Sequence, residues 1–144
     1  SRILYLWDQT VAGTPPDGFS GGSEYSNEQI DQAIQSLDPY SVVPSIDTGG
    51  HGTAVAGIAA GNGSENPDNI GVAPESDLIV VKIGQRGFRP FARTTELMRA
   101  IKYVIEKSRQ LNQPVVINMS FGMNDGSHRG DSLFERATRG FIGK

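Results

Sequence analysis

The chain has 144 residues, a formal net charge of −3 and 37% hydrophobic residues, which suits one modest domain or part of a larger one. The charge is too small and of the wrong sign to predict binding to nucleic acid or to an acidic membrane surface, and no apolar stretch is long enough to span a bilayer. The sequence contains no cysteine, which excludes a disulfide framework and thiolate metal sites.

The first third of the chain predicts a strand, a loop and a helix. Residues 2–7 predict a strand, because residues 3–7 form an apolar run. Residues 12–23 are rich in Gly, Pro and Ser and predict a loop. Ser26 and Gln29 have the spacing of a capping box, which predicts a helix that ends near Leu37.

The middle third predicts a second helix and a second strand. After a loop that contains Pro39 and Pro44, a helix is expected to begin at His51 and to end at Gly61. Residues 62–69 are polar and predict a loop. Residues 78–83 are mostly β-branched and apolar, which is typical of a strand covered on both faces.

The last third predicts helix, strand and helix. Thr94 or Thr95 begins a helix that ends near Gln110, and one face of it carries Leu97, Ile101, Val104 and Ile105. Residues 115–119 predict a strand, and Asp131 begins a helix that reaches about residue 142. Strands that alternate with helices of this length indicate parallel βαβ units, so we expect an α/β fold with a parallel sheet and helices on both faces.

Three motifs occur in a fixed order. Residues 50–61 read GHGTAVAGIAAG, in which a histidine between two glycines opens a run of small residues. Residues 71–74 read GVAP and precede the strand predicted at 78–83. Residues 114–122 read PVVINMSFG, a short apolar run that ends in a polar turn with a glycine. The stretch from the first motif to the last, residues 50–122, is about half of the chain, and the motifs resemble the corresponding segments of the subtilisin-like serine proteases, or subtilases.

The resemblance implies a fold and a mechanism. The implied fold is the subtilisin-like three-layer α/β/α arrangement, incomplete in this chain. The implied activity is peptide-bond hydrolysis by an endopeptidase with a Ser-His-Asp triad, in which His51 takes the proton of the serine and later returns it. Ser120, Phe121 and Gly122 would pair with an extended peptide and line its pocket, and the loop around Gly87 would form a second wall.

The other members of the triad are missing from their expected places. In subtilases the acid precedes the histidine in a D-[ST]-G motif, and the serine follows it in a G-T-S motif. No such serine motif follows Gly122. We therefore expect residues 1–144 to be the central part of one catalytic domain, with the acid before Ser1 and the serine after Lys144. The isolated chain should then be inactive and only marginally stable.

Two aspartates are alternatives for the acid. Asp47 lies in an Ile-Asp-Thr-Gly run that spells the family motif, but it is only four residues before His51. The simpler interpretation of Asp47 is a turn residue or a residue at the start of the His51 helix. Asp8 ends the first predicted strand but lacks the following Thr/Ser-Gly pair. Ser120 is not expected to be the nucleophile, because no G-x-S-x-G elbow surrounds it.

Further expectations follow from the resemblance. The segment 2–10 and the residues after Ser120 are similar to those of the spore-germination branch of the subtilases, which implies a bacterial secreted or spore-associated protein. The partners would be a peptide or protein substrate and the remainder of the catalytic domain. No cofactor is expected, although a polar loop offers oxygen ligands for calcium at Asn62, Glu65, Asn66, Asp68 and Asn69.

Two alternatives to a protease remain. The first is a subtilase-like pseudoprotease that has lost triad residues and acts as a peptide-binding or regulatory scaffold. The second is an unrelated α/β domain in which the motifs occur by chance. A serine and an acid in their family motifs elsewhere in the parent polypeptide would favour the protease.

Overall fold

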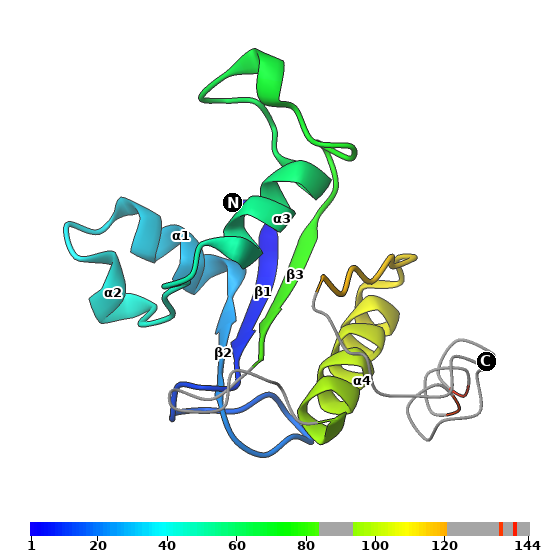
Figure 1. Cartoon of the computed structure of the whole chain (residues 1–144). Helices are drawn as coiled ribbons and strands as arrows, with labels where there is room; N and C mark the ends of the chain where they lie inside the picture. Colours follow the sequence, from blue (N-terminus) through cyan, green and yellow to red (C-terminus); the bar gives the residue numbers. More distant parts are fainter. Residues whose placement is uncertain (84–93, 121–135, 137–139, 141–144) are drawn as a thin grey trace. The chain divides into compact units, whose positions relative to one another are not determined.

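A computed structural model of the chain describes residues 1–83, 94–120, 136 and 140 (Figure 1). The chain divides into two compact units, residues 1–7 with 24–80 and residues 8–23 with 81–144. None of the described helices combines the length and the apolar character needed to cross a bilayer. In chain order the elements are β1 (Ile3–Asp8), β2 (Ser23–Ser26), α1 (Asn27–Gln35), α2 (Pro39–Val42), α3 (His51–Ala60), η1 (Pro67–Asn69), β3 (Leu78–Lys82) and α4 (Thr94–Leu111).

The three described strands form one sheet in the order β2-β1-β3. The arrows of β1 and β3 point the same way and that of β2 points the opposite way (Figure 1). Two of the predicted strands are thus confirmed as β1 and β3, and β2 is an antiparallel edge strand that was not expected. The expectation that β3 is covered on both faces was wrong, because all five of its residues stay partly exposed. Among the described strands, β3 lies at an edge and has a neighbour on one side only.

In the first unit, α1 begins as predicted at a capping box. The Ser26 hydroxyl accepts a hydrogen bond from the backbone N–H of Gln29, and the Gln29 side chain accepts one from the backbone N–H of Ser26 at 2.9 Å. The loop expected around Pro39 contains the short helix α2 instead. A proline fits the first turn of a helix because its N–H would have no partner there.

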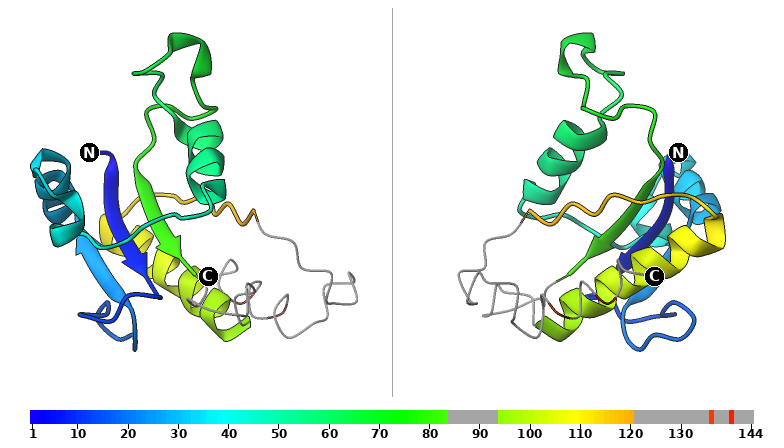
Figure 2. Two further views of the ribbon diagram at one scale, coloured as in Figure 1. Left: turned by 60° about the vertical axis from the view of Figure 1, so that its left-hand side comes forward. Right: turned by 90° about the vertical axis from the view of Figure 1, so that its right-hand side faces the viewer.

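The core of the first unit lies where α1 and α2 meet the strands. In both views of Figure 2, α1 and α2 lie on one side of the strands and α3 lies on the other. The α1 side holds a cluster of buried side chains with partly buried apolar neighbours around it: Tyr25, Ile30, Ala33 and Val43, with Ile3, Leu6 and Val42.

In the second unit, α4 presents the apolar face that its sequence predicts. Leu97, Ile101 and Val104 are buried, whereas Ile105 is only half-buried. The ring of Tyr103 meets Phe19 edge-on, with 5.8 Å between the centroids. The helix ends in a Schellman motif: Asn112 has a positive φ of 52°, and the N–H of Gln113 donates to the carbonyl of Ser108 at 3.0 Å.

The strand expected at residues 115–119 does not form. Residues 113–120 carry no regular structure, and the side chain of Val116 is 96% exposed. A strand needs a neighbour to satisfy its backbone groups, and no described strand pairs with this segment. The helix expected from Asp131 onward lies almost entirely outside the described residues.

Candidate active site

His51 is the first residue of α3 and its side chain is exposed. The N-cap residue is Gly50, whose φ of 70° lies in the left-handed region that glycine enters without strain. The helix ends as predicted at Gly61. The sequence therefore places an accessible imidazole at the start of a helix, which is a position from which it can face a ligand.

Asp47 holds the first turn of α3 through three hydrogen bonds. Its Oδ1 accepts from the backbone N–H of Gly50 at 3.0 Å, and its Oδ2 accepts from the backbone N–H and the Oγ1 of Thr53, both at 2.8 Å. The pKa of Asp47 is lowered because these hydrogen bonds favour the ionised carboxylate. The largest effect comes from the backbone N–H of Thr53, and the next largest from its hydroxyl. Its described partners do not include His51. The interpretation of Asp47 as a residue at the start of the helix is confirmed, and the structure gives no support for it as the triad acid.

The other end of α3 is held by the GVAP segment. The N–H groups of Gly71, Val72 and Ala73 donate to the carbonyls of Gly61, Ile58 and Ala59 at 2.8, 3.1 and 2.8 Å. The guanidinium of Arg2 also donates to the carbonyl of Ala60. The last carbonyls of a helix lack partners within the helix, so this segment and the arginine satisfy them and complement the helix dipole.

The side chains along α3, in contrast, are almost all exposed to solvent. All of its residues are small or apolar apart from His51 and Thr53, yet only Ala60 is buried and the side chain of Ile58 is 71% exposed. A helix that is apolar on every side is typical of the interior of a larger protein. In the described part of the chain, α3 is thus held mainly by its ends.

Asp8 lies at the end of β1 and is fully buried. Its carboxylate accepts from the backbone N–H and the Oγ1 of Thr10 at 2.8 and 2.5 Å, and from the Nζ of Lys82 at 3.2 Å. Lys82 ends β3, so the carboxyl ends of two parallel strands are joined by an ion pair. These partners account for the buried charge of Asp8 and favour a structural role over that of a triad acid.

The residues expected to bind substrate are only partly described. Ser120 is exposed, and its Oγ accepts a hydrogen bond from the Asn118 side-chain amide at 3.0 Å. Phe121, Gly122 and Gly87 lie outside the described residues. A substrate-binding role for these four residues therefore stays a prediction.

The loop that was considered for calcium is built as a turn. The side-chain oxygen of Asn62 accepts from the backbone N–H of Ser64 at 3.2 Å, and that of Asn66 accepts from the N–H of Asp68 at 3.0 Å. Across the described ranges, no three His, Cys, Asp or Glu side chains gather in a group that could hold a metal ion. Two of the five candidate side chains, Asn62 and Asn66, thus use an oxygen in a local hydrogen bond, and calcium binding by this loop stays a prediction.

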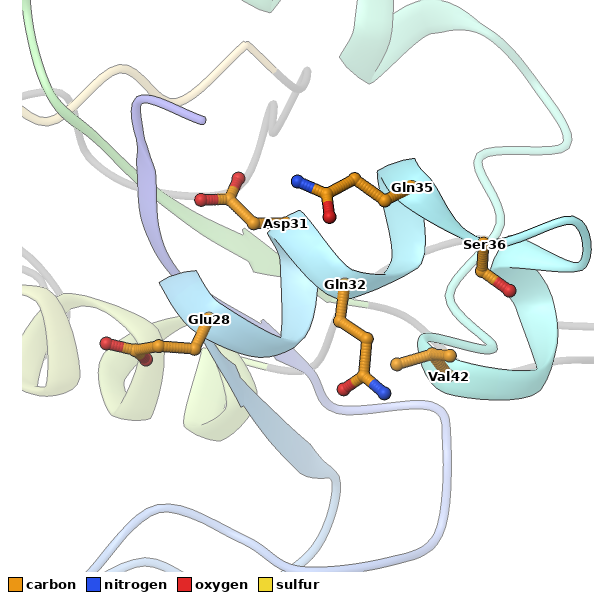
Figure 3. Close-up of a pocket in the computed structure, with 6 residues that line it drawn as sticks. All are labelled: Glu28, Asp31, Gln32, Gln35, Ser36 and Val42. Carbon is orange, nitrogen blue, oxygen red and sulfur yellow. The ribbon is translucent and has the colours of Figure 1, made fainter.

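An open hollow of about 600 Å³ lies along α1 and reaches α2 at Val42 (Figure 3). Its lining is Glu28, Asp31, Gln32, Gln35, Ser36 and Val42. The hydroxyl of Ser36 donates to the carbonyl of Asp38 at 3.2 Å, and no histidine lines the hollow. This lining does not provide a serine beside a general base.

Sequence reasoning placed Asp47 at the start of α3 but missed the contacts that fix the other end of the helix. The GVAP motif was recognised, but not that its backbone approaches α3 so closely that a Cβ on Gly71 would lie 2.5 Å from the backbone nitrogen of Gly61. The contact of Arg2 with α3 spans 58 residues and had no local signal.

Comparisons with known proteins identify the family. The sequence model of the Subtilase family matches residues 18–141. The chain is 39% identical over 100 residues to tripeptidyl-peptidase 2 of Caenorhabditis elegans, a match that covers 68% of this chain and 7% of that protein. It is 38% identical over 82 residues to a subtilisin of Bacillus sp. strain TA39, which covers 56% of this chain and 19% of that protein.

A solved structure agrees with these matches. The structure of the Clostridium perfringens CspB protease superposes with a TM-score of 0.84 and 42% sequence identity, and the match covers 98% of this chain and 28% of that one. The expected α/β fold class is thereby confirmed. The chain spans less than a third of each of these relatives. The chain belongs to the subtilase family of serine proteases.

Proposed function

We propose that this chain is the histidine-bearing part of a serine endopeptidase domain and that His51 is its general base and acid. The observation that carries the proposal is the position of His51, exposed at the start of a helix within a Gly-His-Gly-Thr sequence. An imidazole in that position is free to take a proton from a nucleophilic hydroxyl and to return it to the leaving amine. Family membership supports the reaction class.

The serine and the acid of the triad would come from the remainder of the domain. The bare faces of α3 support this part of the proposal, because an apolar helix with Ile58 71% exposed leaves apolar surface that a larger fold would cover. The chain spans 28% of the CspB protease and 19% of the Bacillus subtilisin. These shares are consistent with a serine and an acid supplied by the remainder of the domain. On this account the isolated chain does not hydrolyse peptides.

The substrate would be an extended peptide. Ser120 with Phe121 and Gly122 would pair with its backbone, and the loop at Gly87 would form a second wall of the pocket. Support comes from the PVVINMSFG motif and from residues 115–120, which are exposed except for the half-buried Ile117 and have no described strand to pair with. The 42% identity to the CspB protease supports a place near the spore-germination branch.

Intact-mass analysis after treatment with a serine-directed fluorophosphonate tests the proposal. The intact protein should gain one adduct, the His51→Ala variant should react at least about 1,000-fold more slowly because the base is lost, and the 144-residue chain should gain none. Absence of labelling in the intact protein would refute the proposal and favour a pseudoprotease that serves as a peptide-binding scaffold. Cleavage products of a long peptide, identified by mass, then show whether the bonds cut are internal.

A further inference from the structure

The carboxylate of Asp47 binds the backbone on both sides of His51. Asp47 accepts from the N–H of Gly50, immediately before His51, at 3.0 Å, and from Thr53, two residues after it, twice at 2.8 Å. The bonds to Gly50 and Thr53 use different oxygens of the carboxylate. The backbone of His51 is therefore held from both sides by one side chain.

The surrounding sequence gives this turn little stiffness of its own. Of the four residues within two positions of His51, three are glycines: Gly49, Gly50 and Gly52. Glycine has the widest backbone freedom of any residue. Gly50 is the N-cap residue and has no side chain to accept the free N–H groups of the first turn. Asp47 takes over that role from three residues upstream.

We propose that Asp47 is a positioning residue for His51: by fixing the first turn of α3, its carboxylate sets the direction in which the imidazole points. The inference rests on the proposed role of His51 as general base. Asp47 acts through the backbone and makes no described hydrogen bond to the imidazole. It thus differs from the triad acid, which would contact the histidine ring directly.

Graded substitutions test this role in the intact protein. Asp47→Ala removes all three hydrogen bonds, whereas Asp47→Asn keeps one acceptor oxygen and replaces the other with an NH2 group, which cannot accept from an N–H group. Because small displacements of a catalytic group are costly, kcat for a peptide substrate should fall by about 10- to 100-fold in the alanine variant and by less in the asparagine variant. KM should stay within about 2-fold of the wild type, because substrate binding does not use the imidazole.

A matched control is Asp38→Ala. Asp38 likewise lies at a helix start, as the N-cap residue of α2, but its side chain makes no capping hydrogen bond. This variant removes an aspartate from a helix start without touching α3, so its kcat should equal that of the wild type. Assays well below the unfolding temperature of every variant separate positioning from loss of folded protein.

NMR relaxation of the His51 ring measures the motion of the imidazole and does not depend on turnover. The ring signals of the intact protein, assigned by their loss in His51→Ala, should show faster and wider ring motion in Asp47→Ala than in the wild type or in Asp38→Ala. Unchanged ring motion in Asp47→Ala, or an unchanged kcat, would overturn the inference. If the wild-type protein has no turnover, the proposed function fails, and ring motion alone then decides whether Asp47 positions His51.

Discussion

The replacement of Gly71 by alanine tests how the C-terminal end of α3 is held. A Cβ at this position would lie 2.5 Å from the nitrogen of Gly61, 2.7 Å from that of Ala60 and 2.8 Å from the carbonyl oxygen of Gly57. All three neighbours are backbone atoms, so none can rotate away. The shortest contact is about 0.9 Å inside the 3.4 Å at which ordinary contact begins, and the segment 71–73 has to move outward.

The magnitude follows from the hydrogen bonds that this movement breaks. The bonds from Gly71, Val72 and Ala73 are 2.8, 3.1 and 2.8 Å long, and a shift of that size takes them beyond bonding distance. At about 1 kcal/mol for each bond, the variant should lose about 3 kcal/mol of local stability. A loss of that size exposes the three amides about 100-fold more often.

Native-state hydrogen exchange of these three amides in the intact protein is the assay. Exchange should be about 100-fold faster in Gly71→Ala than in the wild type. The control is Gly49→Ala, where the nearest atom to a Cβ is 3.9 Å away and the backbone angle suits alanine. Exchange that stays within about 3-fold of the wild type in Gly71→Ala would refute the claim that this segment closes the end of α3 by close backbone approach.

Three further predictions concern other contacts. Lys82→Met removes the ion pair between Lys82 and the buried Asp8 carboxylate and should lower the free energy of unfolding by about 3 kcal/mol, measured by urea denaturation; a loss below about 1 kcal/mol would contradict this. Asp47 has a folded-state pKa below its unfolded value, so its stabilising effect is present above about pH 4 and is lost as the pH falls through the folded pKa. The stability difference between wild type and Asp47→Asn should therefore shrink as the pH is lowered from about 4 in acid titrations, and a constant difference would contradict it. Ser26→Ala removes the cap of α1 and should cost about 1 kcal/mol in the same urea experiment, whereas no change would show that Gln29 alone suffices.

Local patterns in the sequence predicted the elements that depend on local physics. The capping box at Ser26, the glycine that ends α3 and the apolar face of α4 all involve residues within a few positions of one another. The helix at His51 was found for the same reason. The candidate base could be named from its motif because glycines on both sides of a histidine are unusual in a core.

Features that depend on distant partners were not predictable in this way. The edge strand β2 is only four residues long and contains two serines, so its strand character comes from pairing with β1. Conversely, the apolar run at 115–119 has a strand-like sequence but no described neighbour to pair with. The hydrogen bond from Arg2 to the carbonyl of Ala60 in α3 joins residues that are 58 positions apart in the sequence.

The role of Asp47 shows how a motif can mislead. Its Ile-Asp-Thr-Gly context spells the acid motif of the family, but its carboxylate is used by the backbone of the turn that follows. Spacing from His51 was the better guide, because a residue four positions before a helix start can reach its free N–H groups. The structure assigns the motif to the helix start on this geometric ground.

The most direct test of the account is peptide hydrolysis by the intact protein and by its His51→Ala variant. If His51 is the general base and acid, the variant lacks the group that takes the proton from the nucleophile and returns it to the leaving amine. The variant should therefore lose at least about 1,000-fold in kcat/KM. Hydrolysis that survives His51→Ala with an unchanged rate would contradict the central claim.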